Sequence, residues 1–451
     1  MRFLKIIGAV SAPLAIAAMT LLGSGCGGNG TDCSVAAEKQ FILETAQDWY
    51  LFLPLPAVNP DDYATASDYL DALTADARAQ NEDRYFSYVT TKTAEDQFFT
   101  AGKSIIFGIG NLLRPGSDSQ HFRLFVSRVE PNSPAKTAGF VRGDEITAID
   151  DVQISSLSGS QDEVQALISG LFGPSQAGIT RTFTVTPVGG GGTQTRSVTK
   201  QEVTLAPVPL HTVLSGNIGY VVLDTFIDTA DAQLHAAFAD FQAQGVHDVI
   251  VDLRYNGGGL IDVATTLASL LAAQHAGDPM FSYEFNQLRA ADNDETVPFS
   301  SEAEAIAADR IAFITSGGTA SASELTINSL DPYASVAIIG DQTYGKPVGQ
   351  EGFDMPDCDF VLRLIAFRTA NAAGNTDYYD GLPNSQFQGD FCPAADDLTH
   401  ARGDSAETST ATAISWIDNG TCPAAKAVAE PSLVLRAHPL TVLQDNSPGL
   451  F

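Results

Sequence analysis

The stretch from residue 319 to residue 350 constrains the fold most, because a predicted helix and a buried strand lie between its two ends and another predicted strand precedes it. Residues 310–316 read R-I-A-F-I-T-S, with the length and β-branched content of a buried strand, and two glycines follow. Residues 320–330 predict a helix, and residues 334–340, A-S-V-A-I-I-G, predict a second strand. A strand, a helix and a strand in this order are typical of an α/β sheet.

The same unit places a serine and a lysine 25 positions apart. Ser321 falls on the first turn of the predicted helix, where unpaired N–H groups and the helix dipole favour a developing negative charge. Lys346 follows the second strand, in a loop. A buried lysine can activate a serine hydroxyl, because burial lowers the lysine pKa and leaves the amine neutral. The pattern predicts a nucleophile and a base, although a packed helix start and a solvated turn explain the pair alone equally well.

Composition argues against several classes of function. The chain has 451 residues, 44% apolar and 17% charged, which is typical of a globular protein with room for about two or three domains. Its formal net charge of -30 repels phosphate backbones, so nucleic-acid binding is not expected. The seven histidines are scattered and neither C-x-x-C nor H-E-x-x-H occurs, so we expect no metal site and no cofactor.

The first residues have the pattern of an export signal. Arg2 and Lys5 precede an apolar run over residues 6–22, and G-S-G-C ends at Cys26. Small residues before a cysteine resemble a bacterial lipoprotein signal, which implies that Cys26 is lipidated. An ordinary cleaved signal peptide and an uncleaved anchor are the alternatives, and all three readings export the protein. We expect a lipid-anchored protein on the periplasmic side of the envelope, in the outer membrane of a Gram-negative bacterium.

Export places the other four cysteines in an oxidising compartment, where two disulfides are expected. Four cysteines allow three pairings. We favour Cys358 with Cys392 and Cys33 with Cys422.

Two segments resemble the active-site block of the carboxyl-terminal processing peptidases, also called tail-specific proteases. They are G-G-T-A-S-A-S-E, ending at residue 324, and I-I-G-D-Q-T-Y-G-K-P-V-G-Q, ending at residue 350. The resemblance implies Ser321 as nucleophile, Lys346 as general base and Gln350 as the residue that orients the lysine amine. Ser323 is the competing nucleophile, but its spacing to the lysine does not match. Pro347 stands where many members have a small or hydroxyl residue.

Residues 252–260, D-L-R-Y-N-G-G-G-L, resemble the D-L-R-x-N-x-G-G motif of the same family. The resemblance implies that the Gly258 amide supplies half of an oxyanion hole and the N–H of Ala322 the other half. Asp252 and Arg254 fit a structural ion pair as well as a catalytic role. A nucleotide site is not indicated, because G-x-G-x-x-G spacing is absent.

Short strands and glycine turns dominate from residue 102 to residue 207. The run V-E-P-N-S-P-A-K-T-A-G-F-V-R-G-D-E-I-T-A-I-D, residues 129–150, resembles a PDZ domain. Such a domain adds an extended peptide to a sheet edge and captures a terminal carboxylate with backbone N–H groups. A PDZ-like domain also serves as a partner-binding scaffold without an enzyme. The resemblance implies a peptide-binding loop at Phe107, Gly108, Ile109 and Gly110.

The resemblance covers about residues 83–422 and implies an α/β (α+β) multidomain chain with a ClpP/crotonase-like protease core. Helical spacing occurs over residues 34–50 and 68–79, and residues 83–88 resemble the short aromatic stretch that precedes the binding module in this family. We interpret the N-terminal helices as a packing domain. The expected parts are a signal peptide (1–25), a tether and helical domain (26–101), a PDZ-like domain (102–207), a serine protease core (208–425) and a C-terminal tail (426–451).

Two functions from different classes stay open. The first is an exported serine endopeptidase that acts on polypeptides with free or unfolded C-termini, holds them in the PDZ groove and needs no cofactor. The second is a peptide-binding lipoprotein adaptor that kept the fold and lost turnover. The enzyme is favoured because all four residue types of the site stand at their expected spacings. A Ser-His-Asp mechanism through His247 or His400 comes third, since neither histidine lies in a triad motif.

Overall fold

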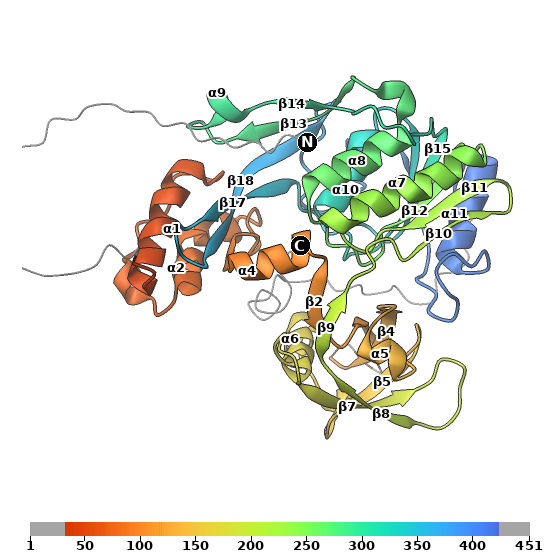
Figure 1. The fold of residues 1–451 in the computed structure, drawn as a ribbon, viewed down its shortest axis with the longest axis horizontal. Coiled ribbons are helices and arrows are strands. Elements are labelled where there is room, and N and C mark those ends of the chain that lie inside the picture. Colours follow the sequence, from red (N-terminus) through yellow and green to blue (C-terminus); the bar gives the residue numbers. More distant parts are fainter. Residues whose placement is uncertain (1–31, 117, 119, 424–451) are drawn as a thin grey trace, which may run out of the picture. The chain divides into compact units, whose positions relative to one another are not determined.

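The computed structural model describes residues 32–116, 118 and 120–423 (Figure 1). The signal peptide, Cys26 and the tail over 426–451 lie outside the described residues. None of the described helices has the length and apolar content of a membrane span.

The largest group of parallel strands belongs to a six-stranded sheet with the order β10-β11-β12-β15-β16-β19. Its strands are β10 (Leu210–Leu214), β11 (Ile218–Val222), β12 (Asp248–Asp252), β15 (Arg310–Thr315), β16 (Ser335–Gly340) and β19 (Asp390–Pro393). The five strands from β11 to β19 are parallel, and β10 pairs antiparallel at one edge. The strands β11, β12, β15 and β16 are buried along almost their whole length, as is usual for parallel strands covered on both faces, which explains their apolar runs.

Helices cover both faces of this sheet. They are α7 (Asp228–Ala243), α8 (Ile261–Leu271), α10 (Ala322–Leu330) and α11 (Thr408–Asn419). Phe238 of α7 and Leu267 of α8 share a buried cluster with Val249 of β12, whereas Trp416 of α11 packs with Ile250 on the opposite face. The prediction of a strand, a helix and a strand is confirmed, as is the mixed α/β class.

A second sheet has the order β1-β18-β13-β14, and β17 pairs antiparallel with residues 361–368 of β18. Its strands are β1 (Tyr88–Thr90), β13 (Pro279–Phe285), β14 (Thr296–Pro298), β17 (Val348–Asp354) and β18 (Val361–Asn371). The helices α1 (Val35–Trp49), α2 (Ala66–Leu73) and α3 (Ala75–Ala79) precede it in the chain. Ile42 and Tyr69 of these helices share one buried cluster with Leu362 and Ile365 of β18. The N-terminal helices therefore pack on the sheet that contains Gln350.

The PDZ-like region contains a sheet with the order β3-β4-β5-β7-β8 and β6 beside β5. Its elements are β3 (Ile109–Pro115), β4 (Phe122–Val129), α5 (Pro134–Thr137), β5 (Glu145–Ile149), β6 (Val152–Gln153), α6 (Gln161–Phe172), β7 (Thr180–Thr186) and β8 (Gln194–Thr199). Before and after it, β2 (Lys103–Ile106) pairs with β9 (Gln201–Thr204). Among the described strands β3 pairs only with β4, so it is an edge strand.

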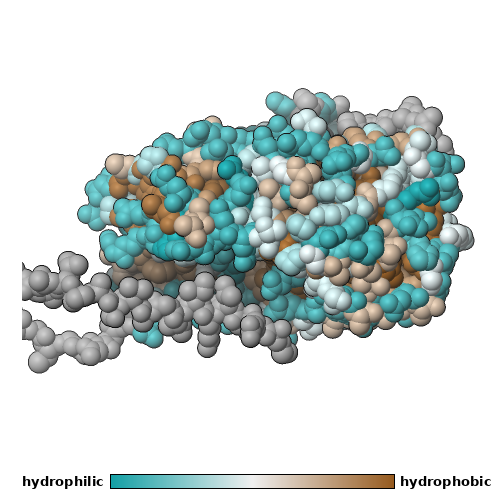
Figure 2. Space-filling model, turned by 90° about the horizontal axis from the view of Figure 1, so that it is seen from above, coloured by the Kyte–Doolittle hydropathy of each residue, from teal (hydrophilic) through white to brown (hydrophobic). Residues whose placement is uncertain are grey.

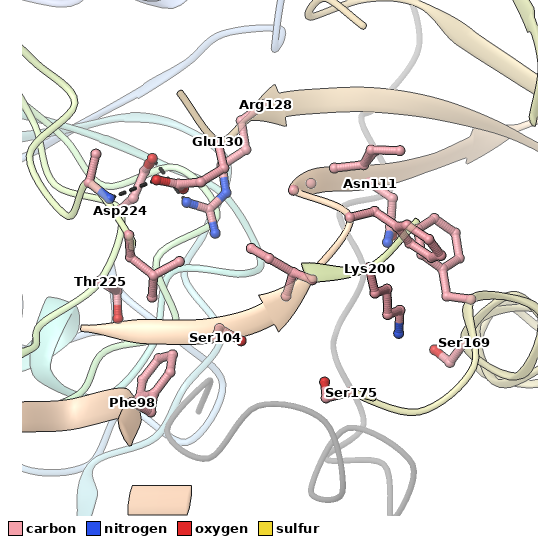
Figure 3. A pocket seen from close by; sticks show the side chains of 18 of the residues that line it. Phe98, Ser104, Asn111, Arg128, Glu130, Ser169, Ser175, Lys200, Asp224 and Thr225 are labelled. Atoms are coloured by element: carbon pink, nitrogen blue, oxygen red, sulfur yellow. Dashed lines mark hydrogen bonds and ion pairs between the residues drawn. The ribbon is translucent and has the colours of Figure 1, made fainter. Parts of the chain in front are cut away.

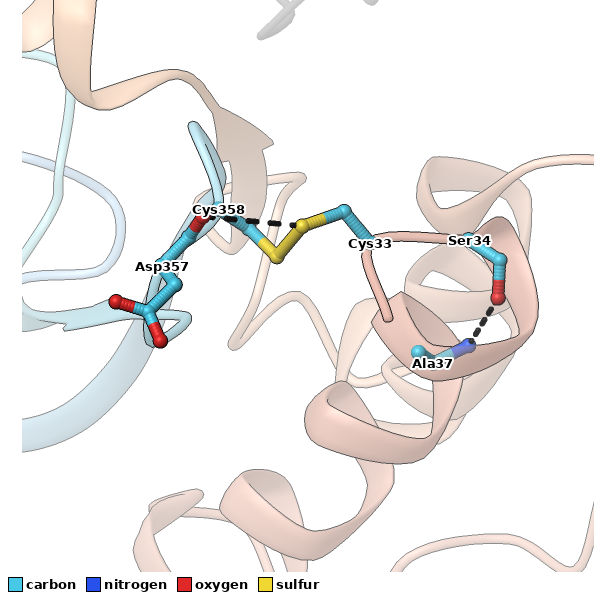
Figure 4. Close-up of a disulfide and its surroundings, with 5 residues drawn as sticks. All are labelled: Cys33, Ser34, Ala37, Asp357 and Cys358. Carbon is cyan, nitrogen blue, oxygen red and sulfur yellow. Dashed lines mark hydrogen bonds between the residues drawn. A yellow bond between two sulfur atoms is a disulfide. The ribbon is translucent and has the colours of Figure 1, made fainter. Parts of the chain in front are cut away.

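The disulfides join Cys33 to Cys358 and Cys392 to Cys422, so the predicted pairing is wrong. Figure 4 shows Cys33 just before α1 and Cys358 in the turn between β17 and β18. The turn lies beside α1 because Phe41 and Phe360 pack edge to face, with ring centroids 6.3 Å apart. Packing between remote segments, which cysteine spacing does not encode, decides the pairing.

The surface is largely hydrophilic on the face that Figure 2 shows. Apolar residues occur there in separate patches. In the described part of the chain, the exposed large apolar side chains come from separate elements: Val35, Val141, Leu167, Val188, Leu288 and Phe391.

Candidate active site

Ser321 lies at a sharp turn between β15 and α10. It is the N-cap residue of α10, with φ 56° and ψ -117°, a backbone conformation that non-glycine residues seldom adopt. The hydroxyl of Thr319 donates to the carbonyl of Leu253 (2.9 Å), and the N–H of Ala320 donates to the carbonyl of Asn256 (3.1 Å). Such conformations persist where neighbouring contacts over-determine them, and they cluster at active sites.

A buried carboxylate joins this turn to the lysine loop. Glu324, which is 0% exposed, accepts hydrogen bonds at Oε2 from the backbone N–H groups of Ser321 (2.9 Å) and Lys346 (2.8 Å). Because both donors bind the same oxygen, the backbone nitrogens of Ser321 and Lys346 lie no more than about 6 Å apart. Its Oε1 accepts from the N–H of Gly345 (2.7 Å) and the hydroxyl of Thr343 (2.5 Å). Burial raises the pKa of Glu324, and these hydrogen bonds oppose the shift.

The Lys346 amine is buried among polar and aromatic groups. Lys346 is 1% exposed, and its Nζ donates to Oε1 of Gln350 (3.0 Å) and lies 4.9 Å from the centre of the Phe86 ring. Burial lowers the pKa of Lys346 to about 7, against the opposing effect of the nearby Asp83 and Glu324 carboxylates. A substantial fraction of this amine is therefore neutral near pH 7, as a general base requires.

Gly258 lies against the nucleophile turn. Its φ is 103°, and a Cβ at this position would lie 2.9 Å from the Ser321 Cβ and 2.9 Å from the Ala322 nitrogen, so no other residue type fits. Ala322 begins α10, and N–H groups in a first turn have no acceptor within the helix. The N–H of Gly258 donates to Oδ1 of Asn256 (2.9 Å) within its own loop. The structure thus brings Gly258 and Ala322, the two predicted oxyanion-hole residues, beside Ser321. The N–H of Gly258 is hydrogen-bonded to the Asn256 side chain.

The competing candidates have structural roles. Ser323 is 0% exposed and its hydroxyl donates to the carbonyl of Asn256 (3.0 Å), whereas Ser321 is half-buried. Arg254 is buried and pairs with Asp252 (2.7 Å), Asp396 (3.0 Å) and Glu407 (2.9 Å), which fixes the loop behind Gly258. His400 pairs with Asp397 in a separate segment.

A cavity of about 260 Å³ lies at the PDZ-like region (Figure 3). One wall is the predicted loop, Phe107, Gly108, Ile109 and Gly110, and the start of β3. The opposite wall is the face of α6 that presents Gln165, Ser169 and Phe172. Gly108 has φ 87°, and a Cβ there would lie 2.0 Å from the Ser133 Cβ. The loop and helix therefore form a groove along the unpaired edge of β3.

Polar groups are placed along this groove. Lys200 donates through Nζ to the carbonyls of Gly173 (2.6 Å) and Pro174 (2.8 Å), and burial lowers its pKa to about 8. Thr225 contributes to the wall from the segment after β11, and its buried Oγ1 has no hydrogen-bond partner among the described residues. The same holds for Oε1 of Gln165. Both buried oxygens line a cavity in which a ligand could satisfy them.

Sequence reasoning missed two contributors to the catalytic region. Ser321-x-x-Glu324 has the spacing of a capping box, a signal that could have identified Glu324 as an anchor. Phe86 belongs to the aromatic stretch over 83–88, but no local pattern shows that this stretch reaches Lys346.

Comparison with known families agrees with both regions. Residues 217–379 match the family described as "Peptidase family S41", and this range contains Gly258, Ser321, Lys346 and Gln350. Residues 125–175 match "PDZ domain", a range that begins after the loop at 107–110.

The chain is also similar in sequence to proteins described as carboxyl-terminal processing peptidases. The chloroplastic C-terminal processing peptidase of Tetradesmus obliquus is 28% identical over 52% of this chain and 50% of its own length. The carboxyl-terminal-processing protease of Synechocystis sp. is 25% identical over 71% of this chain and 70% of its own length. The chain thus spans about half the length of the first relative and 70% of the length of the second.

A crystal structure of an S41 protease candidate from Bacteroides fragilis shows the same fold. It covers 84% of this chain and 97% of that one, with a TM-score of 0.66 and 23% identity.

The Glu324 anchor makes a prediction about stability. Glu324→Gln presents an NH₂ group to N–H donors, so we expect a loss of about 1–3 kcal/mol in the free energy of unfolding, measured by urea denaturation. The matched control is Glu163→Gln, because Glu163 closes the capping box of α6 at an exposed position. It should lose far less, and equal losses in the two variants would contradict the anchoring role.

Proposed function

Because the chain belongs to the S41 carboxyl-terminal processing peptidases and carries their PDZ domain, we propose that it is a serine endopeptidase with Ser321 as nucleophile and Lys346 as general base. One observation carries the assignment. The Glu324 carboxylate holds the turn of a half-buried serine next to a lysine whose pKa is about 7.

The chemistry follows the template of acyl transfer. The Ser321 hydroxyl attacks the peptide carbonyl carbon while its proton passes to the neutral Lys346 amine. The lysine ammonium then protonates the leaving amine as the C–N bond breaks, which leaves an ester on Ser321. Water, deprotonated by the same lysine, hydrolyses this ester and restores the serine.

Two backbone donors are suited to the oxyanion of the tetrahedral intermediate. The N–H of Ala322 lies at the positive end of α10 and is the first donor. The N–H of Gly258 becomes the second when it exchanges the Asn256 side chain for the substrate oxyanion.

The groove beside β3 suits the carboxyl-terminal segment of a polypeptide. We propose that an extended segment pairs with the unpaired edge of β3 and that backbone N–H groups of the loop at Phe107 and Gly108 bind its terminal carboxylate. Phe107 and Phe172 pack with ring centroids 6.0 Å apart and offer an apolar site for the last side chain. We therefore propose polypeptides with free or unfolded C-termini as substrates.

We also propose that the protein is anchored by a lipid on Cys26 at the periplasmic side of the envelope. The sequence pattern over residues 1–26 supports this location. Two disulfides within the described residues agree with an oxidising compartment.

Substitutions at the two reacting residues test the mechanism. Ser321→Ala and Lys346→Ala should each lower kcat for an unstructured peptide by about 1,000-fold or more without changing the fold. Lys346→Arg should be equally inactive, because a guanidinium does not release its proton at working pH. Full activity in any of the three variants would refute the assignment.

The pH dependence has a defined sign. Lys346 acts as the neutral amine, so kcat/KM should fall as pH decreases through about 7, by tenfold per pH unit on the acid side. A flat profile from pH 8 to pH 5 would contradict a neutral lysine base.

The groove makes a prediction about the substrate terminus. A peptide with a free C-terminal carboxylate should bind at least about 10-fold more tightly to Ser321→Ala protein than its C-terminal amide, because the loop N–H groups bind the charged group. Phe172→Ala should weaken this binding, whereas Leu167→Ala, on an exposed position of the same helix, should not. Equal affinities of acid and amide, measured by calorimetry, would exclude carboxylate capture.

The anchor is tested by Cys26→Ser. In cells that process lipoproteins, this variant should move from the membrane fraction to the soluble fraction, with Cys33→Ser as the control that stays in membranes. Unchanged membrane retention of Cys26→Ser would refute lipidation.

A further inference from the structure

A segment far from the reacting residues in sequence packs beside the Lys346 amine. Residues 83–88 precede Lys346 by more than 250 positions. The side chain of Phe86 is 1% exposed, and its ring centre lies 4.9 Å from Nζ of Lys346 and 6.1 Å from the ring centre of Tyr344. The ring therefore occupies space beside the amine that water would otherwise fill.

The backbone of Phe86 also fixes the residue that orients the lysine. Nε2 of Gln350 donates a hydrogen bond to the Phe86 carbonyl, while Oε1 of the same amide accepts from Nζ of Lys346 at 3.0 Å. A carbonyl oxygen only accepts, so it selects the NH₂ side of the amide. The opposite side of the amide, an acceptor, is consequently the one that faces the lysine.

A neighbouring side chain holds the loop before the lysine. The Arg84 guanidinium donates to the carbonyl of Gly345 and lies 4.4 Å from the centre of the Tyr344 ring. Glu324 binds the same loop from the other side through the N–H groups of Gly345 and Lys346. The loop is thus held between α10 and the N-terminal segment.

The segment itself is firmly placed. The buried carboxylate of Asp83 accepts from the Tyr50 hydroxyl (2.9 Å), the N–H of Phe86 (2.7 Å) and the hydroxyl of Ser87 (2.7 Å). On the other side, the N–H of Ile365 donates to the Ser87 hydroxyl oxygen (3.1 Å), and β1 pairs with β18. The N-terminal helices and the second sheet therefore determine where Phe86 lies.

We propose that Phe86 is a positioning residue for the general base: its ring excludes water from Nζ of Lys346, and its carbonyl sets the Gln350 amide. The N-terminal helical segment is then part of the active site as well as a packing unit. This inference rests on the proposed Ser/Lys mechanism.

The charges around the lysine make the role of the ring measurable. Two carboxylates, Asp83 and Glu324, favour the charged amine, and two guanidinium groups, Arg84 and Arg363, oppose it. These charges oppose one another, and burial is the dominant cause of the lowered pKa of Lys346. Loss of the Phe86 ring leaves all four charges in place and removes part of the burial of the amine. Water then stabilises the ammonium, so the lysine pKa should rise and the neutral fraction at pH 7 should fall.

The test is the pH profile of kcat/KM for Phe86→Ala, with an unstructured peptide as substrate. We expect the midpoint of the acid limb to move up by at least about one pH unit, which means about 10-fold lower activity at pH 7 and recovery at pH 9. The more conservative Phe86→Leu should show a smaller shift, because it retains an apolar side chain beside the amine.

Leu73→Ala is the matched control. Leu73 is 1% exposed and belongs to the same buried cluster as Phe86. Leu73→Ala should lower the melting temperature and reduce activity, because it removes buried apolar contacts. It should not move the midpoint of the acid limb of the kcat/KM profile.

Each outcome has a defined meaning. An unchanged midpoint in folded Phe86→Ala overturns the inference. If that variant does not fold, an unchanged midpoint in Phe86→Leu overturns it as well. Equal peptide cleavage by wild type and Ser321→Ala would instead refute the proposed function. If Ser321→Ala is inactive and the midpoint of Phe86→Ala is unchanged, only the positioning role of Phe86 is refuted.

Discussion

The shared hydrogen bonds of Glu324 are the constraint on which the catalytic geometry depends. One carboxylate oxygen accepts from the N–H of Ser321 and from the N–H of Lys346, and the other accepts from Gly345 and Thr343. A fully buried carboxylate is costly unless it is well satisfied, and four donors satisfy it here. The helix that begins at the serine and the loop that contains the lysine are therefore coupled through the backbone, independently of any contact between the reacting atoms.

Three separate regions then complete the surroundings of Ser321 and Lys346. The loop over 252–260 lies against the serine turn at Gly258, β17 supplies Gln350, and the N-terminal segment supplies Phe86. The disulfide from Cys33 to Cys358 connects the start of α1 to the turn that follows β17. The helices at the N-terminus and the strand with the orienting glutamine are thus held together covalently and by a common apolar cluster.

Much of the fold could be predicted from the sequence, and the exceptions have two physical causes, one local hydrogen bond and contacts between remote segments. The strand, helix and strand around Ser321 have strong periodicity, and their observed bounds differ from the predicted ones by two residues or fewer. The helix predicted over 68–79 is broken at Thr74 into α2 and α3. The hydroxyl of Thr74 donates to the Leu70 carbonyl, a hydrogen bond that bends helices. The disulfide pairing and the reach of Phe86 to Lys346 depend on contacts between remote segments, which leave no local pattern.

The central claim, that Lys346 activates Ser321, is tested most directly by covalent labelling with a fluorophosphonate and mapping of the adduct by mass spectrometry. The account predicts one adduct per chain on Ser321, a labelling rate that falls as pH drops through about 7, and no adduct in Lys346→Ala. An adduct on Ser323, or labelling of Ser321 at the same rate without the lysine, would contradict it.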